Sequence, residues 1–228
     1  MKGTQFLLDA LEQLRTIGIR FELCLVERVD RVKAIELYRS GDIVADQFVM
    51  GAYGVFALEC LALGKPVLTY LDHDHLSNPV FNLPVVNTNR WNLTVVLAVL
   101  LQVPELRERL AQAGREAVVR YQSHEAIGEI NNILYQHLWY GKKLDLSGTP
   151  HFSSERSCRS FSEDPADPQF WPVDVEGLQS GIANAVKLVR TGLKEIALKA
   201  PTSSAQQSVH DSSVTSTRKA ELPVRRGC

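Results

Sequence analysis

The 228-residue sequence lacks an excess of charge of either sign, because 25 Lys and Arg residues offset 26 Asp and Glu residues and leave a formal net charge of -1. Proteins that bind nucleic acid through their overall charge are basic, so nucleic acid is not an expected partner. Cysteine is also scarce: the chain has four, and no two form a C-x-x-C pair. This usage is typical of a reducing compartment. We therefore predict a cytoplasmic protein.

Long apolar runs are absent as well. The longest, 93–101, is too short to cross a bilayer. The first residues lead directly into a helical pattern and lack the apolar core and cleavage site of a signal peptide. A chain of this length can nevertheless bury a sizeable core, so we predict a globular protein.

What the sequence does contain is an alternation of helix and strand patterns. Apolar residues at helical spacing alternate with short continuous apolar runs that are typical of strands buried on both faces. Such alternation indicates parallel strands with crossover helices, and hence an α/β fold with a Rossmann-like parallel sheet and flanking helices. Strands are expected at 21–26, 42–46, 66–70 and 83–87, and helices up to about residue 16 and at 30–39, 54–63, 104–121 and 125–139. Trp91, Trp139 and Tyr140 are expected to anchor the core.

The composition changes after Lys143, which sets the expected domain boundary. Residues 1–143 form the predicted domain, and 144–174, rich in Ser, Asp and Pro, form a predicted linker. An amphipathic stripe predicts a helix within 175–200. This helix has three possible roles: docking on the domain, lying on a membrane surface, or pairing with another chain. Residues 201–228 are rich in Ser and Thr and are expected to be a disordered tail.

The stretch Met50 to Val67, MGAYGVFALECLALGKPV, combines a glycine-flanked turn with an apolar helix. A helix start offers unpaired backbone amides and partial positive charge, and Gly51 and Gly54 let an anion approach the main chain. Within the helix, Glu59 is a carboxylate in apolar surroundings and needs partners. It either holds the ribose of a nucleotide diphosphate, or emerges at the helix edge, or pairs with a nearby Lys or Arg. The residues alone favour neither kind of role.

These blocks together resemble a known family. The segments KGTQFLLDALEQL, FELCLVE, ELYRSGDIVADQFVMGAYGVFALECLALGKPVLTYL and LPVVNTN are similar to the donor-binding, C-terminal domain of GT-B glycosyltransferases, close to the large retaining family 4, glycosyl transferases group 1. The likeness covers about residues 2–139. Its most specific part is G-x-Y-G-V-F-A-x-E-x-L-A-L-G-K-P-V.

The resemblance implies a retaining, hexosyltransferase-type glycosyltransferase of polysaccharide biosynthesis. It would transfer a sugar from a nucleotide-diphosphate-sugar donor to a glycan or lipid-linked acceptor, with no metal and no cofactor. The donor-binding residues follow from the same resemblance. Glu59 matches the glutamate that holds the ribose, the amides around Tyr53, Gly54 and Val55 match those that hold the diphosphate, and Lys2 matches a lysine that neutralises the phosphates.

The sequence departs from the family in two places. Gly51 stands where many members have a first carboxylate that approaches the transferred sugar, so the catalytic residue is unknown. Lys2 lies at the chain start, so the strand before it, a paired arginine and an acceptor-binding domain are expected to be missing. The chain is then half of a GT-B fold that lacks its first strand and is followed by a poorly ordered C-terminal extension. The alternative is a non-catalytic nucleotide-sugar-binding or interaction module derived from such an enzyme.

A cluster of metal-ligand residue types, Asp72-His73-Asp74-His75, follows the third expected strand. Adjacent residues on one loop rarely converge on one ion. We therefore expect a solvated loop near the donor pocket and no metal.

Overall fold

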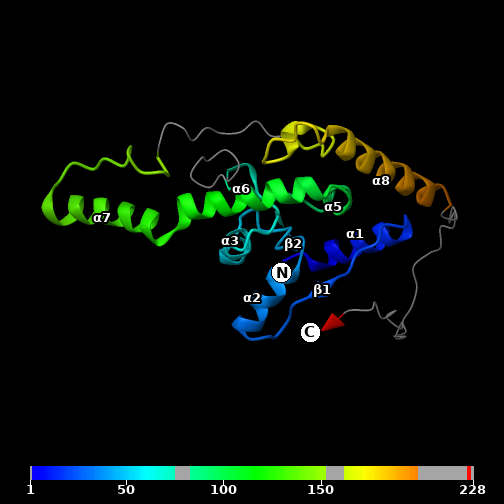
Figure 1. Cartoon of the computed structure of the whole chain (residues 1–228), viewed down its shortest axis with the longest axis horizontal. Helices are drawn as coiled ribbons and strands as arrows, with labels where there is room; N and C mark the ends of the chain where they lie inside the picture. The colour runs from blue at the N-terminus through cyan, green and yellow to red at the C-terminus, as the bar shows by residue number, and fades with distance from the viewer. Residues whose placement is uncertain (1, 75–82, 153–161, 200–224, 227–228) are drawn as a thin grey trace, which may run out of the picture.

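The computed structural model describes residues 2–74, 83–152, 162–199 and 225–226 (Figure 1). In these ranges the protein is α/β, with helices packed around short strands. The helices are α1 (Thr4–Thr16), α2 (Arg31–Ser40), α3 (Val55–Ala62), α5 (Leu93–Gln102), α6 (Pro104–Gln122), α7 (His124–Tyr140) and α8 (Gln179–Lys199). The strands are β1 (Cys24–Leu25), β2 (Val44–Ala45), β3 (Val67–Thr69), β4 (Val86–Asn87) and β5 (Arg225–Arg226).

A parallel three-stranded sheet in the order β2-β3-β4 lies at the centre of the fold. Val44 pairs with Val67, and Leu68 pairs with Val86. The predicted parallel α/β architecture is confirmed at this level, and the sheet is compatible with a Rossmann-like fold. Because the carboxyl ends of parallel strands meet at one edge, the loops after β2, β3 and β4 gather there.

Strand β1 departs from its prediction. Within the described residues it pairs in parallel only with β5, through Cys24 and Leu25. Cys24 is exposed and Leu25 is half-buried, so the predicted burial on both faces is wrong. A strand is buried on both faces only inside a covered sheet, and β1 is not joined to the β2-β3-β4 sheet. The other residues of the expected tail, 201–224 and 227–228, lie outside the described residues.

The apolar run from Leu93 forms α5, a helix that its residue pattern did not predict. Every residue of this helix from Leu93 to Leu100 is buried except Val95. A segment that is apolar all round has no hydrophobic period, so helix and strand patterns cannot be told apart in it. Helix α5 packs against α1, α6 and α8 and forms the middle of the main core.

The amphipathic helix α8 docks on the domain, which is the first of the three roles that its sequence left open. It packs against α5 and buries Ile182, Ala185 and Val189. The end of the expected linker joins the same core, because Phe170 and Trp171 are buried there and the Trp171 indole N–H donates to the Pro165 carbonyl at 3.1 Å. Residues 153–161 of that linker lie outside the described residues.

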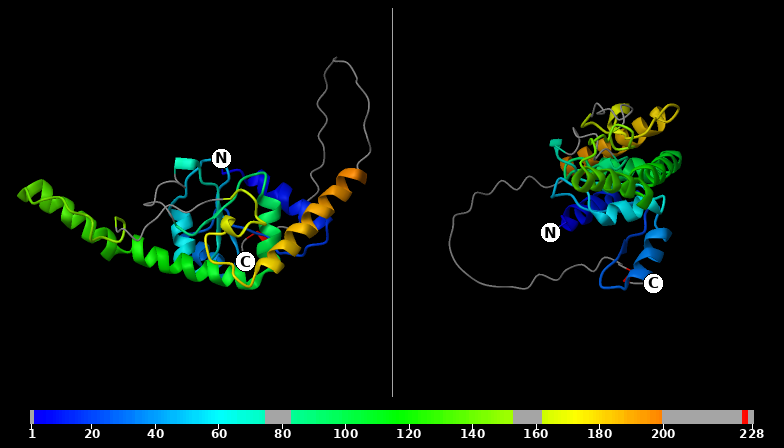
Figure 2. Two further views of the ribbon diagram at one scale, coloured as in Figure 1. Left: turned by 90° about the horizontal axis from the view of Figure 1, so that it is seen from above. Right: turned by 90° about the vertical axis from the view of Figure 1, so that its left-hand side faces the viewer.

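Helices α6 and α7 follow each other along one side, and α7 projects beyond the body of the molecule (Figures 1 and 2). Ser123 separates them and caps α7, since its hydroxyl accepts a hydrogen bond from the Ala126 amide at 3.2 Å. Trp139 and Tyr140 are 71% and 74% exposed, and Trp91 is exposed too. Their prediction as core anchors is therefore wrong. Among the described residues, the helices are all too short or too polar to span a bilayer.

Candidate functional site

The candidate site is the loop that joins β2 to α3, at the carboxyl edge of the sheet. Strand β2 ends at Ala45, and α3 begins at Val55. The intervening residues include the glycine-flanked turn that the sequence singled out.

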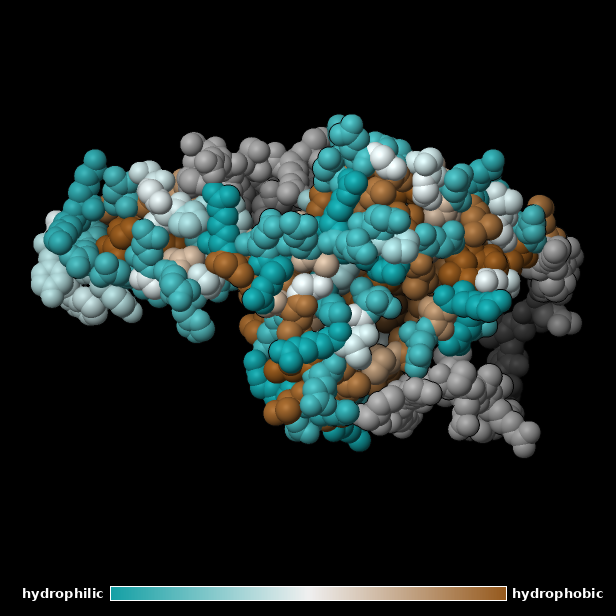
Figure 3. Space-filling view, viewed as in Figure 1, coloured by the Kyte–Doolittle hydropathy of each residue, from teal (hydrophilic) through white to brown (hydrophobic). Residues whose placement is uncertain are grey.

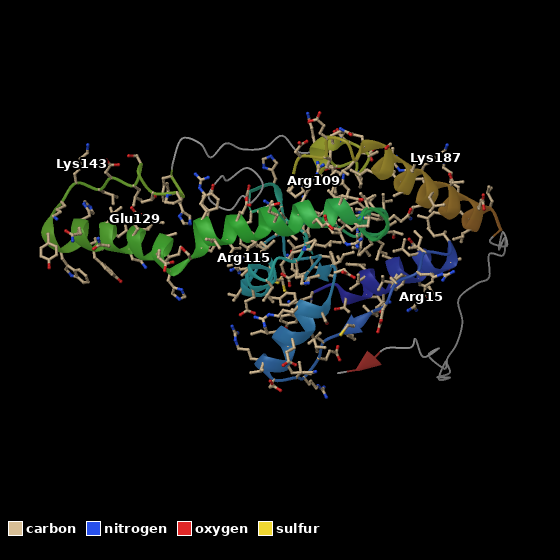
Figure 4. The ribbon with its side chains drawn as sticks, in the orientation of Figure 1. Arg15, Arg109, Arg115, Glu129, Lys143 and Lys187 are labelled. Atoms are coloured by element: carbon tan, nitrogen blue, oxygen red, sulfur yellow. The ribbon has the colours of Figure 1, made fainter. Side chains whose placement is uncertain are left out.

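At the far end of α3, the Arg115 guanidinium of α6 donates to the Ala62 carbonyl (Figure 4). This contact places positive charge where the helix dipole is negative.

Gln47 holds this loop in shape. Its side-chain carbonyl accepts hydrogen bonds from the amides of Val49 at 3.0 Å and Met50 at 2.7 Å. Its side-chain amide donates to the carbonyls of Ala52 and, at 3.0 Å, of Tyr70 after β3. A buried amide with all these partners rigidifies its surroundings. The motif did not reveal this role, although a polar residue directly after a buried strand was a signal for it.

Gly51 adopts a backbone conformation with φ of 74°, which favours glycine. A Cβ atom on residue 51 would lie 2.7 Å from Oδ2 of Asp72, which follows β3. The Asp72 amide also donates to the Gly51 carbonyl at 2.9 Å. The carboxylate of Asp72 therefore occupies the space into which a side chain at position 51 would project.

Lys2 reaches the same edge from the segment before α1. The Phe48 amide donates to the Lys2 carbonyl at 2.8 Å, and the Lys2 ammonium lies 2.7 Å from Oδ1 of Asp46. The Asp46 side chain is only 3% exposed, whereas that of Lys2 is 58% exposed. The ammonium also lies 4.7 Å from the ring centroid of Phe56, in the first turn of α3. A positive charge thus stands beside the start of this helix.

The start of α3 is open to solvent. Gly54 is its N-cap and provides no side-chain cap, and both Gly54 and Val55 are exposed. A Cβ on Gly54 would meet nothing within 4 Å. Tyr53, in contrast, is half-buried and packs against the smaller core cluster beneath α3. The helix start therefore combines an uncapped N-terminus, room for an approaching group and the charge of Lys2.

Glu59 lies one turn further along α3, and its Oε1 is 2.7 Å from Nη2 of Arg31, near the start of α2. The Glu59 side chain is 27% exposed and that of Arg31 is 74% exposed. Of the alternatives that the residues left open, pairing with a nearby basic side chain is the one seen. Because the guanidinium is so exposed, this ion pair is weak and does not prevent a second partner from reaching Glu59.

The charged groups of the site act together on Cys60, which is buried in α3. Burial, and then the negative charges of Asp46 and Glu59, raise the pKa of the Cys60 thiol to about 12. The Lys2 ammonium opposes this rise. The charges of Lys2, Asp46 and Glu59 therefore all act on one buried residue of α3.

The loop after β3 begins at the same edge. His73 and Asp74 are exposed, and His75 lies outside the described residues. Nowhere in the described part of the chain do three His, Cys, Asp or Glu side chains gather as a metal site requires.

Comparison of the chain with family models, with curated proteins and with solved structures finds no match.

Proposed function

We propose that this chain is the donor-binding part of a retaining glycosyltransferase. It binds a nucleotide-diphosphate sugar and presents it for transfer to a glycan or lipid-linked acceptor. The observation that supports this most directly is the position of the Lys2 ammonium, 4.7 Å from the Phe56 ring in the first turn of α3. A helix N-terminus with an ammonium group beside it is suited to a diphosphate.

The remaining donor contacts follow the sequence resemblance. The diphosphate binds the amides at Tyr53, Gly54 and Val55, and the ribose hydroxyls bind the Glu59 carboxylate. Glu59 lies one turn beyond the helix start, which leaves room for a ribose between the two. Arg31 then moves away from Glu59 or stays as its second partner, at little cost because its side chain is exposed.

Asp72 is the candidate for the carboxylate that Gly51 lacks. Its carboxylate lies in the space that a side chain at position 51 would enter, next to the residue that aligns with the family's first carboxylate. In this proposal Asp72 lies near the transferred sugar and stabilises positive charge that develops there during transfer.

A non-catalytic nucleotide-sugar-binding module is the second candidate function. Two observations favour it: the first carboxylate position is Gly51, and the helix start at Gly54 and Val55 is exposed to water. An acceptor-binding domain on another segment or chain would be the partner that turns the binding module into an enzyme.

Isothermal titration with UDP, GDP and ADP tests the donor site. We expect one of these to bind, and we expect Lys2→Gln and Glu59→Gln each to weaken that binding by about 1–3 kcal/mol through lost charge-assisted hydrogen bonds. Lys65→Gln is the matched control for Lys2, because Lys65 precedes β3 and lies at the opposite edge of the sheet.

Arg31→Gln is the control for Glu59, since it removes the ion pair and leaves the carboxylate. If Glu59 has only a structural role, the Glu59→Gln and Arg31→Gln proteins should both bind nucleotide as tightly as the wild type does. Absence of binding to all three nucleotides would overturn the donor-site proposal as a whole.

A further inference from the structure

Trp91 is a large aromatic residue that the fold leaves in solvent, with 78% of its surface exposed. Figure 3 shows apolar groups scattered among hydrophilic ones over one face of the molecule, so exposure alone does not mark a binding site. Three further features distinguish Trp91. It lies on a rigid turn, an arginine packs against its ring, and the turn stands at the carboxyl edge of the β2-β3-β4 sheet.

The turn that carries Trp91 is held by two asparagine side chains. Oδ1 of Asn89 accepts hydrogen bonds from the amides of Trp91 at 2.8 Å and Asn92 at 3.2 Å. Oδ1 of Asn92 accepts one from the Asn89 amide at 2.9 Å in return. Leu93, the next residue, is fully buried at the start of α5. The turn therefore presents the indole in a fixed position, and a ligand that binds there does not need to order the backbone.

Arg90 places hydrogen-bond donors beside the indole ring. Its guanidinium carbon lies 4.2 Å from the centroid of the Trp91 ring, a cation–π contact. In the described part of the chain this guanidinium makes no ion pair and no hydrogen bond, so its five N–H donors are available to a ligand. A pyranose sugar matches these groups, because it has a face of C–H groups and a rim of hydroxyls.

The turn lies in line with the proposed donor site. The strand order is β2-β3-β4, and the loop after β3 contacts the chain on both sides. The Asp72 amide donates to the Gly51 carbonyl after β2 at 2.9 Å, and the Leu71 amide donates to Oδ1 of Asn87 at the end of β4, also at 2.9 Å. Along this edge the start of α3 comes first, then Asp72, then the turn with Trp91. In the proposed function the diphosphate and the transferred sugar occupy the first two places, which leaves the third for the acceptor.

We propose that Trp91 and Arg90 form a platform that holds a pyranose unit of the acceptor glycan. The C–H face of the sugar stacks on the indole, and its hydroxyls accept hydrogen bonds from the guanidinium. Stacking selects sugars whose hydroxyls are equatorial, such as glucose and N-acetylglucosamine, because these hydroxyls point away from the ring face. The role of the sugar as acceptor rests on the proposed donor function, whereas its binding to Trp91 does not.

Saturation-transfer NMR titrations of the full chain with maltotriose, cellotriose and chitotriose, without nucleotide, test the platform. We expect at least one trisaccharide to bind the wild type. Trp91→Ala should raise its dissociation constant by more than about tenfold, and Arg90→Gln by a smaller factor. Trp139→Ala is the matched control, because Trp139 is a similarly exposed tryptophan on α7, and its loss should leave the dissociation constant unchanged. Circular dichroism checks that each variant is folded.

Nucleotide titration of the same variants separates the platform from the donor site. Trp91→Ala should bind nucleotide as tightly as the wild type does. A chain that binds a trisaccharide through Trp91 but binds no nucleotide would support the platform and overturn the donor site. Absence of binding to all three trisaccharides overturns the platform, and so do equal losses in Trp91→Ala and Trp139→Ala. Sedimentation with phosphatidylglycerol vesicles that depends on Trp91, without trisaccharide binding, would overturn it in favour of a membrane contact.

Discussion

At the residue scale, Gly51 and Asp72 occupy adjoining space after two neighbouring strands, and this proximity makes position 51 intolerant of a side chain. A Cβ there would meet Oδ2, Cβ and Cγ of Asp72 at 2.7–3.0 Å, and φ is positive. We expect Gly51→Ala to lower the free energy of unfolding by about 1–3 kcal/mol, measured by urea denaturation, because both the backbone strain and the contact oppose it.

Gly41→Ala is the control for this substitution. Gly41 has φ of -77°, and an added Cβ would make only ordinary contacts of 3.7 Å or more. The change should be neutral or stabilise the protein by up to about 1 kcal/mol, since alanine restricts the unfolded chain. Equal effects of the two substitutions would mean that Asp72 and the loop move without cost.

The buried thiol of Cys60 should make stability depend on alkaline pH. Its pKa is raised by burial, and then by Asp46 and Glu59, to about 12 in the folded protein. Between about pH 9 and pH 12 the unfolded chain therefore releases this proton while the folded chain keeps it. Because the folded state binds more protons, the free energy of unfolding falls as pH rises in this window, by at most about 1.4 kcal/mol per pH unit for one group.

Urea denaturation at pH 8, 9 and 10 measures this slope. These pH values span the ordinary pKa of a cysteine thiol, which is about 8.5. The Cys60→Ala protein should be less stable at every pH because of the lost packing, yet its stability should fall less steeply above pH 9. A wild-type slope equal to that of Cys60→Ala would show that Cys60 ionises in the folded protein as readily as in the unfolded chain.

At the element scale, the amphipathic helices and the presence of parallel strands could be predicted from the sequence, because helices have a period and glycines punctuate the alternating segments. The pattern ends α1 at Thr16 and begins α6 at Pro104, as observed. Helix α5 could not be predicted, since it is apolar on every side. The burial of β1 was predicted wrongly because a strand pattern does not reveal which neighbours the strand will have.

The site was predictable only in part for a related reason. The motif indicated the glycine turn and Glu59, which are marked by residue type within a short stretch. The resemblance also named Lys2, but neither its pairing with Asp46 across 44 positions nor the contact of Gln47 with Tyr70 across 23 was predicted. Such contacts depend on tertiary packing, which local patterns do not specify.

The docking of α8 on α5 is expected to support the whole core. Val189 on α8 is fully buried, whereas the adjacent Leu188 is 47% exposed. Val189→Ser should lower the free energy of unfolding by about 2–4 kcal/mol, since it leaves a small cavity and buries a hydroxyl. Leu188→Ser is the matched control and should cost less than about 1 kcal/mol. Thermal denaturation of both proteins measures the difference, and similar losses would show that α8 is not held on α5 in solution.

At the scale of the whole molecule, the proposed donor site is a surface rather than a closed cleft. The Lys2 side chain is more than half exposed, and Gly54 and Val55 at the helix start are exposed to water. Binding of a diphosphate needs only these groups. Transfer also requires that water be excluded and that the acceptor hydroxyl be held at the anomeric carbon, a positioning effect that contributes roughly 7–11 kcal/mol to lowering a barrier.

We therefore expect the chain alone to bind a donor without transferring its sugar at a useful rate. The measurement is a product assay with UDP- and GDP-sugars and a panel of glycan and lipid-linked acceptors, performed on the chain and on a fusion that places the N-terminal domain of a GT-B enzyme before Met1. Transfer by the fusion alone would support a donor domain that needs an opposite wall. Nucleotide binding without transfer in either protein would favour the non-catalytic module. Multiple turnovers by the chain alone would contradict the prediction, because they would require its open surface, or a second copy of the chain, to exclude water and hold the acceptor.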